Sequence, residues 1–305
     1  MNILVGYTGF VGSNLVDTMH FDLLLNSKNV ELGYGTNPDL LVYAGVTGTK
    51  FLANLNPDMD SAVIENAKKN IKAINPKRLV LISTVDVYDD LQSKDEFYES
   101  NINNLCIYGK NRKELELWVE REIQNYHIVR IPALYGKNLK KNYVNDLINP
   151  IPKFLDKTTM RDIEMEFPDI YDYYILNNNG YYTYNSQFQN KRIYKYFKFS
   201  KYNSLRFTDS RAQYQFINLK LLCDYLRFAI SNEISVVNVV TEPIGADELK
   251  KEVDGETFVN YITETPIKYN LKTRYAPHTN YFLKKEEVLE DLKKFILSER
   301  KKITG

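Results

Sequence analysis

Residues 2–16 read NILVGYTGFVGSNLV, and this stretch decides the fold. A short apolar run at residues 2–6 leads into a glycine-rich turn and then a helical pattern over residues 13–20. In a first βα unit of this kind, one glycine permits the tight turn, a second lets backbone approach a pyrophosphate, and a third lets helix and strand pack closely. The amides at the helix N-terminus attract the phosphates. We therefore expect a dinucleotide at Gly6, Gly9, Phe10, Val11 and Gly12, the alternative being a glycine-rich turn without a ligand.

Further apolar runs at residues 22–25, 39–44, 78–83 and 126–131 alternate with helical patterns at residues 60–74 and 108–124. Near-continuous apolar strands separated by helices indicate a parallel sheet that is covered on both faces. We predict an α/β fold, a doubly wound parallel sheet of the Rossmann type with a smaller C-terminal substrate-binding domain. The dinucleotide-binding domain is expected at residues 1–136, and the chain is expected to return to it near residues 212–240. Residues 137–305 are expected to form mainly the substrate-binding region.

The segment at residues 139–210 is rich in Asn, Tyr and Lys and has little clean periodicity. Basic and aromatic residues are interleaved from residue 191 to residue 211, a mixture that can bind single-stranded nucleic acid through stacking and phosphate contacts. Because the net charge is near zero and a cofactor fold precedes the segment, we favour a solvated, tyrosine-rich surface and expect no nucleic-acid partner. A few of its cations are candidates for contact with a diphosphate group.

The composition argues against several functional classes. The 305 residues carry 40 Lys and Arg against 39 Asp and Glu, a net charge of +1, which disfavours a nucleic-acid or membrane-surface binder that relies on bulk charge. No apolar run is long enough to span a bilayer and no basic segment precedes the first apolar stretch, so we expect a cytoplasmic protein without a membrane partner. Cys106 and Cys223 cannot build a disulfide framework, and His20, His127 and His278 lack the spacing of a metal site.

The residues after the second apolar run bear on the choice of cofactor. A site selective for NAD usually places an acidic residue there, where it binds the ribose hydroxyls. This sequence has Asn26, Ser27 and Lys28 at that point, and Glu31 is expected to lie beyond the strand. A lysine with neutral hydrogen-bonding neighbours suits a 2′-phosphate, so we favour NADP while NAD stays possible. An ordinary polar turn is the competing interpretation.

Several motifs in the same order resemble those of the extended short-chain dehydrogenase/reductase family, especially its nucleotide-sugar reductases, epimerases and dehydratases. Besides the glycine loop they are residues 41–45 (LVYAG), 83–88 (STVDVY), 108–112 (YGKNR), 129–136 (VRIPALYG) and 215–218 (QFIN). The resemblance covers residues 1–136 well and residues 140–210 hardly at all. It implies a nucleotide-sugar substrate and cofactor contacts at Ala44, Gly45 and Pro132.

The same resemblance implies a catalytic set of Thr84, Tyr108 and Arg112. Thr84 would hydrogen-bond the substrate oxygen, and Tyr108 would be the general acid/base. A tyrosine has a reference pKa of ~10, so this role requires a nearby cation. The family uses a lysine four residues after the tyrosine, and this chain has Arg112 there. Arginine is cationic, but its planar fork does not replace an ammonium and cannot relay its own proton. A slow enzyme or a catalytically silent dinucleotide-binding protein is the alternative.

The activity that the resemblance implies is an NAD(P)-dependent oxidoreductase or epimerase acting on a nucleotide-linked keto sugar. Asp86 stands where dehydratases of the superfamily carry a proton-abstracting acid, although an aspartate that caps a turn after a strand is more frequent. Arg211 and Arg274 are further candidate substrate residues, Arg274 resembling the late arginine that binds a diphosphate. A homodimer is expected through the helices at residues 60–74 and 108–124, the second of which carries Leu115, Trp118, Val119 and Ile123.

Overall fold

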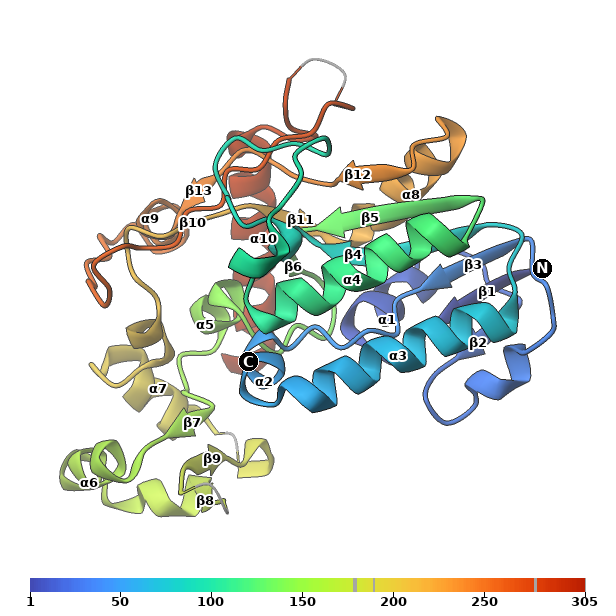
Figure 1. Cartoon of the computed structure of the whole chain (residues 1–305). Helices are drawn as coiled ribbons and strands as arrows, with labels where there is room; N and C mark the ends of the chain where they lie inside the picture. The colour runs from blue at the N-terminus through green and yellow to red at the C-terminus, as the bar shows by residue number, and fades with distance from the viewer. Residues whose placement is uncertain (178–179, 189, 277–278, 305) are drawn as a thin grey trace. The chain divides into compact units, whose positions relative to one another are not determined.

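The computed structural model describes residues 1–177, 180–188, 190–276 and 279–304 (Figure 1). The chain divides into two compact units. The first comprises Met1–Leu139, Tyr214–Pro243 and Lys268–Val288, and the second comprises Lys140–Gln213, Ile244–Ile267 and the chain from residue 289 onward. The first division of the chain thus falls three residues after the boundary expected at residue 136.

A six-stranded parallel sheet forms the centre of the first unit, in the order β12-β5-β4-β3-β1-β2 (Figure 1). The strands β1 to β5 each begin or end within a few residues of a predicted apolar run, and β12 falls in the predicted return near residues 212–240. The order reverses after β1 as in doubly wound folds. The predicted fold class is confirmed. The strands are β1 (Asn2–Val5), β2 (Leu23–Leu25), β3 (Leu40–Tyr43), β4 (Leu79–Thr84), β5 (Tyr126–Ile131) and β12 (Val236–Asn238).

Helices cover both faces of this sheet. Leu4 and Val42 point to one face, where they pack with residues of α1 (Phe10–Val16) and α8 (Leu222–Ser231). Ile3, Val5 and Leu41 point to the other face, which is covered by α3 (Pro57–Ile74) and α4 (Ile107–Glu122) (Figure 1). Because successive side chains of a strand point to opposite faces, a sheet buried on both sides needs unbroken apolar runs, which is the pattern of the sequence.

Shorter elements complete the first unit. Two strands, β6 (Ala133–Tyr135) and β11 (Phe216–Asn218), pair in parallel. The helix α2 (Lys50–Leu55) lies between β3 and α3 in the chain, and α10 (Lys285–Thr304) begins in this unit and continues in the second. The single-turn helices are η1 (Val30–Gly33), η2 (Val85–Val87), η3 (Ile102–Asn104) and η7 (Leu219–Leu221).

The second unit has a small antiparallel sheet with the order β7-β9-β8 and a core rich in aromatic residues. The expectation of a solvated surface is wrong for part of residues 191–211, because Tyr194 and Phe197 are buried. In α7 the apolar Ile193 and Phe197 face the core and the basic side chains stay exposed, so the interleaved pattern is that of an amphipathic helix. The elements are α5 (Tyr143–Ile148), β7 (Phe154–Leu155), α6 (Lys157–Glu166), η4 (Pro168–Tyr173), β8 (Tyr174–Leu176), β9 (Tyr182–Tyr184), η5 (Ser186–Phe188), α7 (Lys191–Phe199), η6 (Ser204–Phe207), β13 (Ile244–Gly245) and α9 (Ala246–Asp254), while β10 (Gln213–Tyr214) spans a division between units.

In the described part of the chain, we find no helix with the length and apolar character that crossing a membrane requires.

The glycine loop joins β1 to α1 through two close backbone approaches. Gly6 has a φ of +94°, in the left-handed region that favours glycine, and a Cβ atom there would lie 2.4 Å from the carbonyl oxygen of Ala44. A Cβ atom at Gly12 would lie 2.1 Å from the carbonyl oxygen of Gly6. The first helix can therefore pack on the first strand only while position 12 lacks a side chain.

We expect Gly12→Ala to lower the free energy of unfolding by about 1–3 kcal/mol, because the added methyl group forces α1 away from the loop. Gly48→Ala is the matched control, since a Cβ atom at Gly48 meets no atom within 4 Å. Urea unfolding of both variants provides the measurement. Equal losses of stability in the two variants would contradict the packing argument.

Candidate active site

The predicted cofactor residues follow the carboxyl ends of β1, β3 and β5, which lie at one edge of the parallel sheet. The amide of Gly6 donates to the carbonyl of Leu25 (2.7 Å), and Gly9 donates to Gly6 (2.9 Å), so the loop is held by its own backbone. Gly9 precedes α1 as the N-cap and provides no side chain to bond the amides of the first turn. Such amides suit an anionic oxygen. Ala44, Gly45 and Pro132 follow β3 and β5 at the same edge.

The turn after β2 contains no acidic residue at the strand end, as the sequence indicated. The side chain of Asn26 is turned toward the backbone, where its Oδ1 accepts from the amide of Lys28 (2.8 Å), and the amide of Asn26 donates to Oδ1 of Asn29 (2.7 Å). Ser27 and Lys28 are exposed at the tip of this turn. Glu31 lies in η1, outside the strand, as expected. Lys28 is therefore the charged group at the end of β2.

Tyr108 lies in the first turn of α4, close to the end of β4. Its amide donates to Oδ1 of Asn54 (3.0 Å), and its side chain is buried. The next residue, Gly109, lets the helix approach η2, because a Cβ atom there would lie 2.1 Å from the carbonyl oxygen of Asp86. Thr84 ends β4 and accepts a hydrogen bond from the amide of Asp86 (3.2 Å). The close packing at Gly109 thus brings Tyr108, Thr84 and Asp86 into one small region.

The electrostatic surroundings of Tyr108 favour its protonated form. Burial raises the pKa of the Tyr108 phenol to about 12. The charge of Arg112 and a hydrogen bond with Thr84 lower this pKa, while the carboxylates of Asp86 and Asp60 raise it, and burial outweighs the lowering contributions. The phenol therefore keeps its proton at neutral pH.

Arg112 lies against the ring of Tyr108, with its guanidinium carbon 3.9 Å from the ring centroid. The side chain is buried, and its Nη2 donates to the carbonyl of Thr47 (2.6 Å) while Nη1 donates to Asp60 and to the carbonyl of Tyr108 (3.3 Å). Its Nε is buried without a hydrogen-bond partner among the described residues. Arg112 therefore holds α4, α3 and the segment after β3 together, in addition to placing a positive charge beside the tyrosine.

Asp60 is the partner that the sequence did not reveal. It lies in α3, 52 residues before Arg112 in the chain, and its carboxylate also accepts a hydrogen bond from Nδ2 of Asn111 (2.8 Å). Both charged side chains of the pair are 4 % exposed. The local signal in the sequence is an acidic residue in the first turn of an amphipathic helix. An acidic residue at that position is usually exposed, so its burial could not be expected.

A second buried ion pair lies under the carboxyl ends of β4 and β5. Arg130 in β5 donates through Nη2 to Glu116 of α4 (2.7 Å) and through Nη1 to the hydroxyl of Tyr88 (2.7 Å). Ser83 donates to the same Glu116 carboxylate (2.5 Å). Burial opposes the charge of Glu116, but Arg130 and these hydrogen bonds hold the pKa of its carboxyl below the ordinary value. An arginine inside an otherwise apolar strand was the available signal for this pair.

Asp86 forms a third charged cluster with residues outside the predicted set. Its Oδ1 accepts from Nζ of Lys50 (2.8 Å) and from the hydroxyl of Tyr269 (2.7 Å). Lys50 opens α2, and Tyr269 comes from the last segment of the first unit. The turn after β4 is thus capped by Thr84, and the carboxylate of Asp86 contacts side chains from two distant segments.

The two predicted substrate arginines belong to different units. Arg274, in the first unit, donates through Nε to Asp95 (2.8 Å) and lies over the ring of Phe97. Arg211, in the second unit, donates to both carboxylate oxygens of Asp209 and to the carbonyl of Thr263. Each guanidinium is thus oriented by an acidic neighbour within its own unit.

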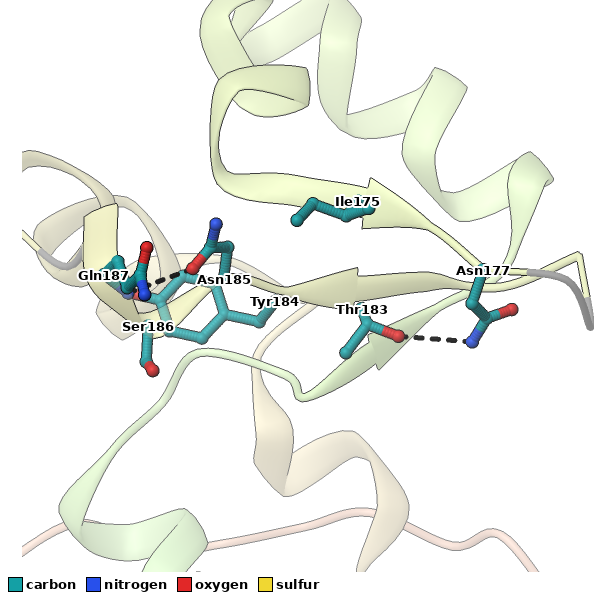
Figure 2. Close-up of a pocket in the computed structure, with 7 residues that line it drawn as sticks. All are labelled: Ile175, Asn177, Thr183, Tyr184, Asn185, Ser186 and Gln187. Carbon is teal, nitrogen blue, oxygen red and sulfur yellow. Dashed lines mark hydrogen bonds between the residues drawn. The ribbon is translucent and has the colours of Figure 1, made fainter.

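Other candidate sites carry little chemistry. The structure has no cluster of metal-ligating side chains within its described residues, and His278 lies outside them. A pocket of about 540 Å³ in the second unit is lined by Tyr184 with amide and hydroxyl side chains, and it contains none of the predicted site residues (Figure 2). Its amides mainly brace the local turns, as in the bond from Nδ2 of Asn177 to Thr183 (3.2 Å).

Comparison with known proteins now bears on the family. The model of the family described as RmlD substrate binding domain matches residues 1–153. The chain belongs to this family. The match covers β1 to β6 and thus the glycine loop, Thr84, Tyr108 and Arg112. The predicted kinship with the nucleotide-sugar reductases and epimerases of the extended short-chain dehydrogenase/reductase family is confirmed.

Solved structures similar to this RmlD-family chain show the same fold over nearly its whole length. A UDP-glucose 4-epimerase from Thermotoga maritima with UDP-glucose is 14% identical, with a TM-score of 0.63 and 99% and 100% of the two chains covered. A dTDP-4-dehydrorhamnose reductase from Bacillus anthracis in complex with NADP is 16% identical, with a TM-score of 0.61 and 97% of each chain covered. RMD from Pseudomonas aeruginosa complexed with NADPH is 15% identical, with a TM-score of 0.60 and 99% of each chain covered. No curated protein matches the sequence significantly.

We expect Asp60→Asn to lower the free energy of unfolding by about 3–5 kcal/mol, because it leaves the buried Arg112 guanidinium without its counter-charge. Asp39→Asn is the control, since Asp39 is 59% exposed in its pair with Lys77 and its loss should change stability little. Urea unfolding at neutral pH compares the two. Similar small effects in both variants would show that the buried pair does not stabilise the fold.

Proposed function

We propose that the protein is an NADP(H)-dependent reductase of a nucleotide-linked keto sugar, with Tyr108 as the proton donor. The observation that carries this proposal is the placement of Tyr108, whose buried phenol is hydrogen-bonded with Thr84 and lies over the guanidinium of Arg112. Reduction of a ketone requires a proton at the carbonyl oxygen, and a phenol that keeps its proton at neutral pH is suited to donate it. Family membership and the dTDP-4-dehydrorhamnose reductase fold support the same reaction class.

Each residue of the proposed site would have a separate role in the reaction. The hydroxyl of Thr84 would hold the carbonyl oxygen, and the phenol of Tyr108 would transfer its proton to that oxygen. A bound NADPH would supply the hydride. Arg112 would stabilise the phenolate left behind, since its guanidinium lies over the ring. It would not relay the proton, because an arginine stays protonated.

The cofactor loop fits a dinucleotide. Positions 6 and 12 have no room for a Cβ atom, and Gly9 leaves the first amides of α1 without a side-chain cap. Lys28, exposed at the end of β2, is the candidate for the 2′-phosphate of NADP, and the strand end offers no carboxylate for the hydroxyls of NAD. We therefore propose NADP as the preferred cofactor.

We expect NADPH to bind roughly tenfold more tightly than NADH, in line with a charge-assisted contact to a phosphate. Lys28→Ala should remove this preference and leave NADH affinity unchanged, whereas Lys69→Ala, an exposed lysine of α3, should change neither. Fluorescence titration measures the six affinities. Tighter binding of NADH by the wild type would make the NADP proposal wrong, and absence of binding would remove the dinucleotide site altogether.

We expect Tyr108→Phe to lower the rate of NADPH-dependent reduction of a keto sugar such as dTDP-4-dehydrorhamnose by ~10²–10⁴-fold, because it removes the proton donor. Cofactor affinity should stay near the wild-type value. Thr84→Val should lower the rate by a smaller factor, since it removes one hydrogen bond and part of the orientation of the substrate. Loss of NADPH absorbance measures the rates.

The pH dependence provides the control for this mechanism. Oxidation of the product alcohol needs the phenolate, whose fraction rises about tenfold per pH unit below the pKa, so oxidation should accelerate between pH 7 and pH 9 while reduction changes little. Tyr108→Phe should abolish that acceleration.

Wild-type turnover in Tyr108→Phe would contradict the mechanism, and tight cofactor binding without turnover on any keto sugar would favour a silent dinucleotide-binding protein. Appearance of a dehydrated product would favour a dehydratase that uses Asp86.

Arg211 and Arg274 remain our candidates for the substrate diphosphate, and a homodimer remains our expectation for the assembly. The apolar residues that the sequence assigned to this interface are already used within the unit, since Leu115 and Val119 are buried and Trp118 and Ile123 pack against the same core. The exposed apolar side chains of this region lie instead mainly on α2 and at the start of α3, at Phe51, Leu52, Leu55 and Met59. A dimer formed through α3 and α4 would therefore draw on these side chains.

A further inference from the structure

Lys50, Asp86 and Tyr269 form a polar cluster next to Tyr108. The carboxylate of Asp86 accepts from both other side chains through one oxygen, Oδ1, and Nζ of Lys50 lies 3.5 Å from the hydroxyl of Tyr269. The charge of Asp86 acts on the phenol of Tyr108, and its carbonyl oxygen lies against Gly109 in the same turn of α4. The cluster is therefore adjacent to the proposed proton donor.

The backbone fixes the position of Asp86. Its amide donates to Oγ1 of Thr84, and Gly109 packs on its carbonyl, so the residue is held from both sides. Tyr269 stacks on Tyr214 with ring centroids 6.5 Å apart. Burial and the nearby Asp86 carboxylate raise the pKa of the Tyr269 phenol above its ordinary value, so this phenol remains a hydrogen-bond donor.

The second carboxylate oxygen of Asp86, Oδ2, accepts no hydrogen bond from any residue that the structure describes. The side chain is 16% exposed, so part of it is open to solvent. A carboxylate that is paired with an ammonium group accepts hydrogen bonds and donates none. Oδ2 is therefore open to a donor group of a bound molecule.

We propose that Oδ2 of Asp86 binds a hydroxyl group of the sugar, and that Lys50 and Tyr269 are positioning residues that hold the carboxylate for this contact. The inference rests on the proposed function, since it assumes that a nucleotide sugar enters beside Tyr108. It narrows the substrate to a sugar that keeps a free hydroxyl at the contacted position. Lys50 compensates the charge of Asp86, and Tyr269 occupies the remaining lone pair of Oδ1.

The test measures binding by the full chain saturated with NADP⁺. UDP-glucose, dTDP-glucose and the 2-, 3-, 4- and 6-deoxy analogues of each are the probes, and calorimetry gives the dissociation constants. For the wild type we expect one deoxy position to weaken binding on the order of ten- to a hundredfold, as for a hydrogen bond to a charged group. Asp86→Ala and Lys50→Met should bind that analogue and its parent sugar equally, whereas Lys50→Arg should retain most of the discrimination and Tyr269→Phe part of it.

Lys68→Met is the matched control, because Lys68 pairs with Glu65 on the surface of α3 and should leave the discrimination intact. Unchanged affinity for NADP⁺ in every variant shows that the fold has survived. The inference is overturned if Lys50→Met discriminates as well as the wild type, if no deoxy analogue is distinguished, or if Lys50→Met weakens NADP⁺ binding, which would assign the cluster to the cofactor. Discrimination by the sugar series without NADPH oxidation on a keto sugar would instead contradict the proposed reductase and leave the sugar contact standing.

Discussion

The ion pair between Arg112 and Asp60 joins the elements on which the site depends. Through it α4 is tied to α3, and the bond to the carbonyl of Thr47 ties both helices to the segment after β3. Tyr108 lies directly over this guanidinium, so its ring rests on a group that is itself held from two other elements. Burying two charges is costly unless their geometry and remaining hydrogen bonds are good. A helix placed in this way has little freedom to rotate, and the direction of the phenol is fixed with it.

The same arrangement explains why arginine and lysine would act differently at this position. Arginine presents a planar fork, and this chain uses the two ends of the fork for Asp60 and for a backbone carbonyl. A lysine has a single ammonium group and could not make both contacts in the same way. The departure from the family pattern therefore changes a group available for proton relay into one that supports the structure and contributes charge at a distance.

Local patterns in the sequence were sufficient for the sheet and for part of the site. The apolar runs and the glycines at positions 6, 9 and 12 are patterns of residues that lie close together in the chain. Thr84, Tyr108 and Arg112 belong to motifs of a few residues. The partners of these residues could not be predicted, because they are distant in the chain: Lys50 precedes Asp86 by 36 residues, and Tyr269 follows it by 183. In the segment at residues 139–210 the aromatic residues obscured the helical period, since tyrosine can be buried as in α7 or exposed as at Tyr181.

The pairing of charges around the site also bears on the protonation of Tyr108. Arg112 is paired with Asp60, Lys50 with Asp86, and Arg130 with Glu116, so each cation has a carboxylate of its own. A paired cation stabilises a nearby phenolate less than a free one, because the carboxylate opposes its field. Burial therefore dominates, and the pKa of Tyr108 lies above that of a free tyrosine. The charge pairs that stabilise the fold thus also leave the Tyr108 phenol in its protonated form.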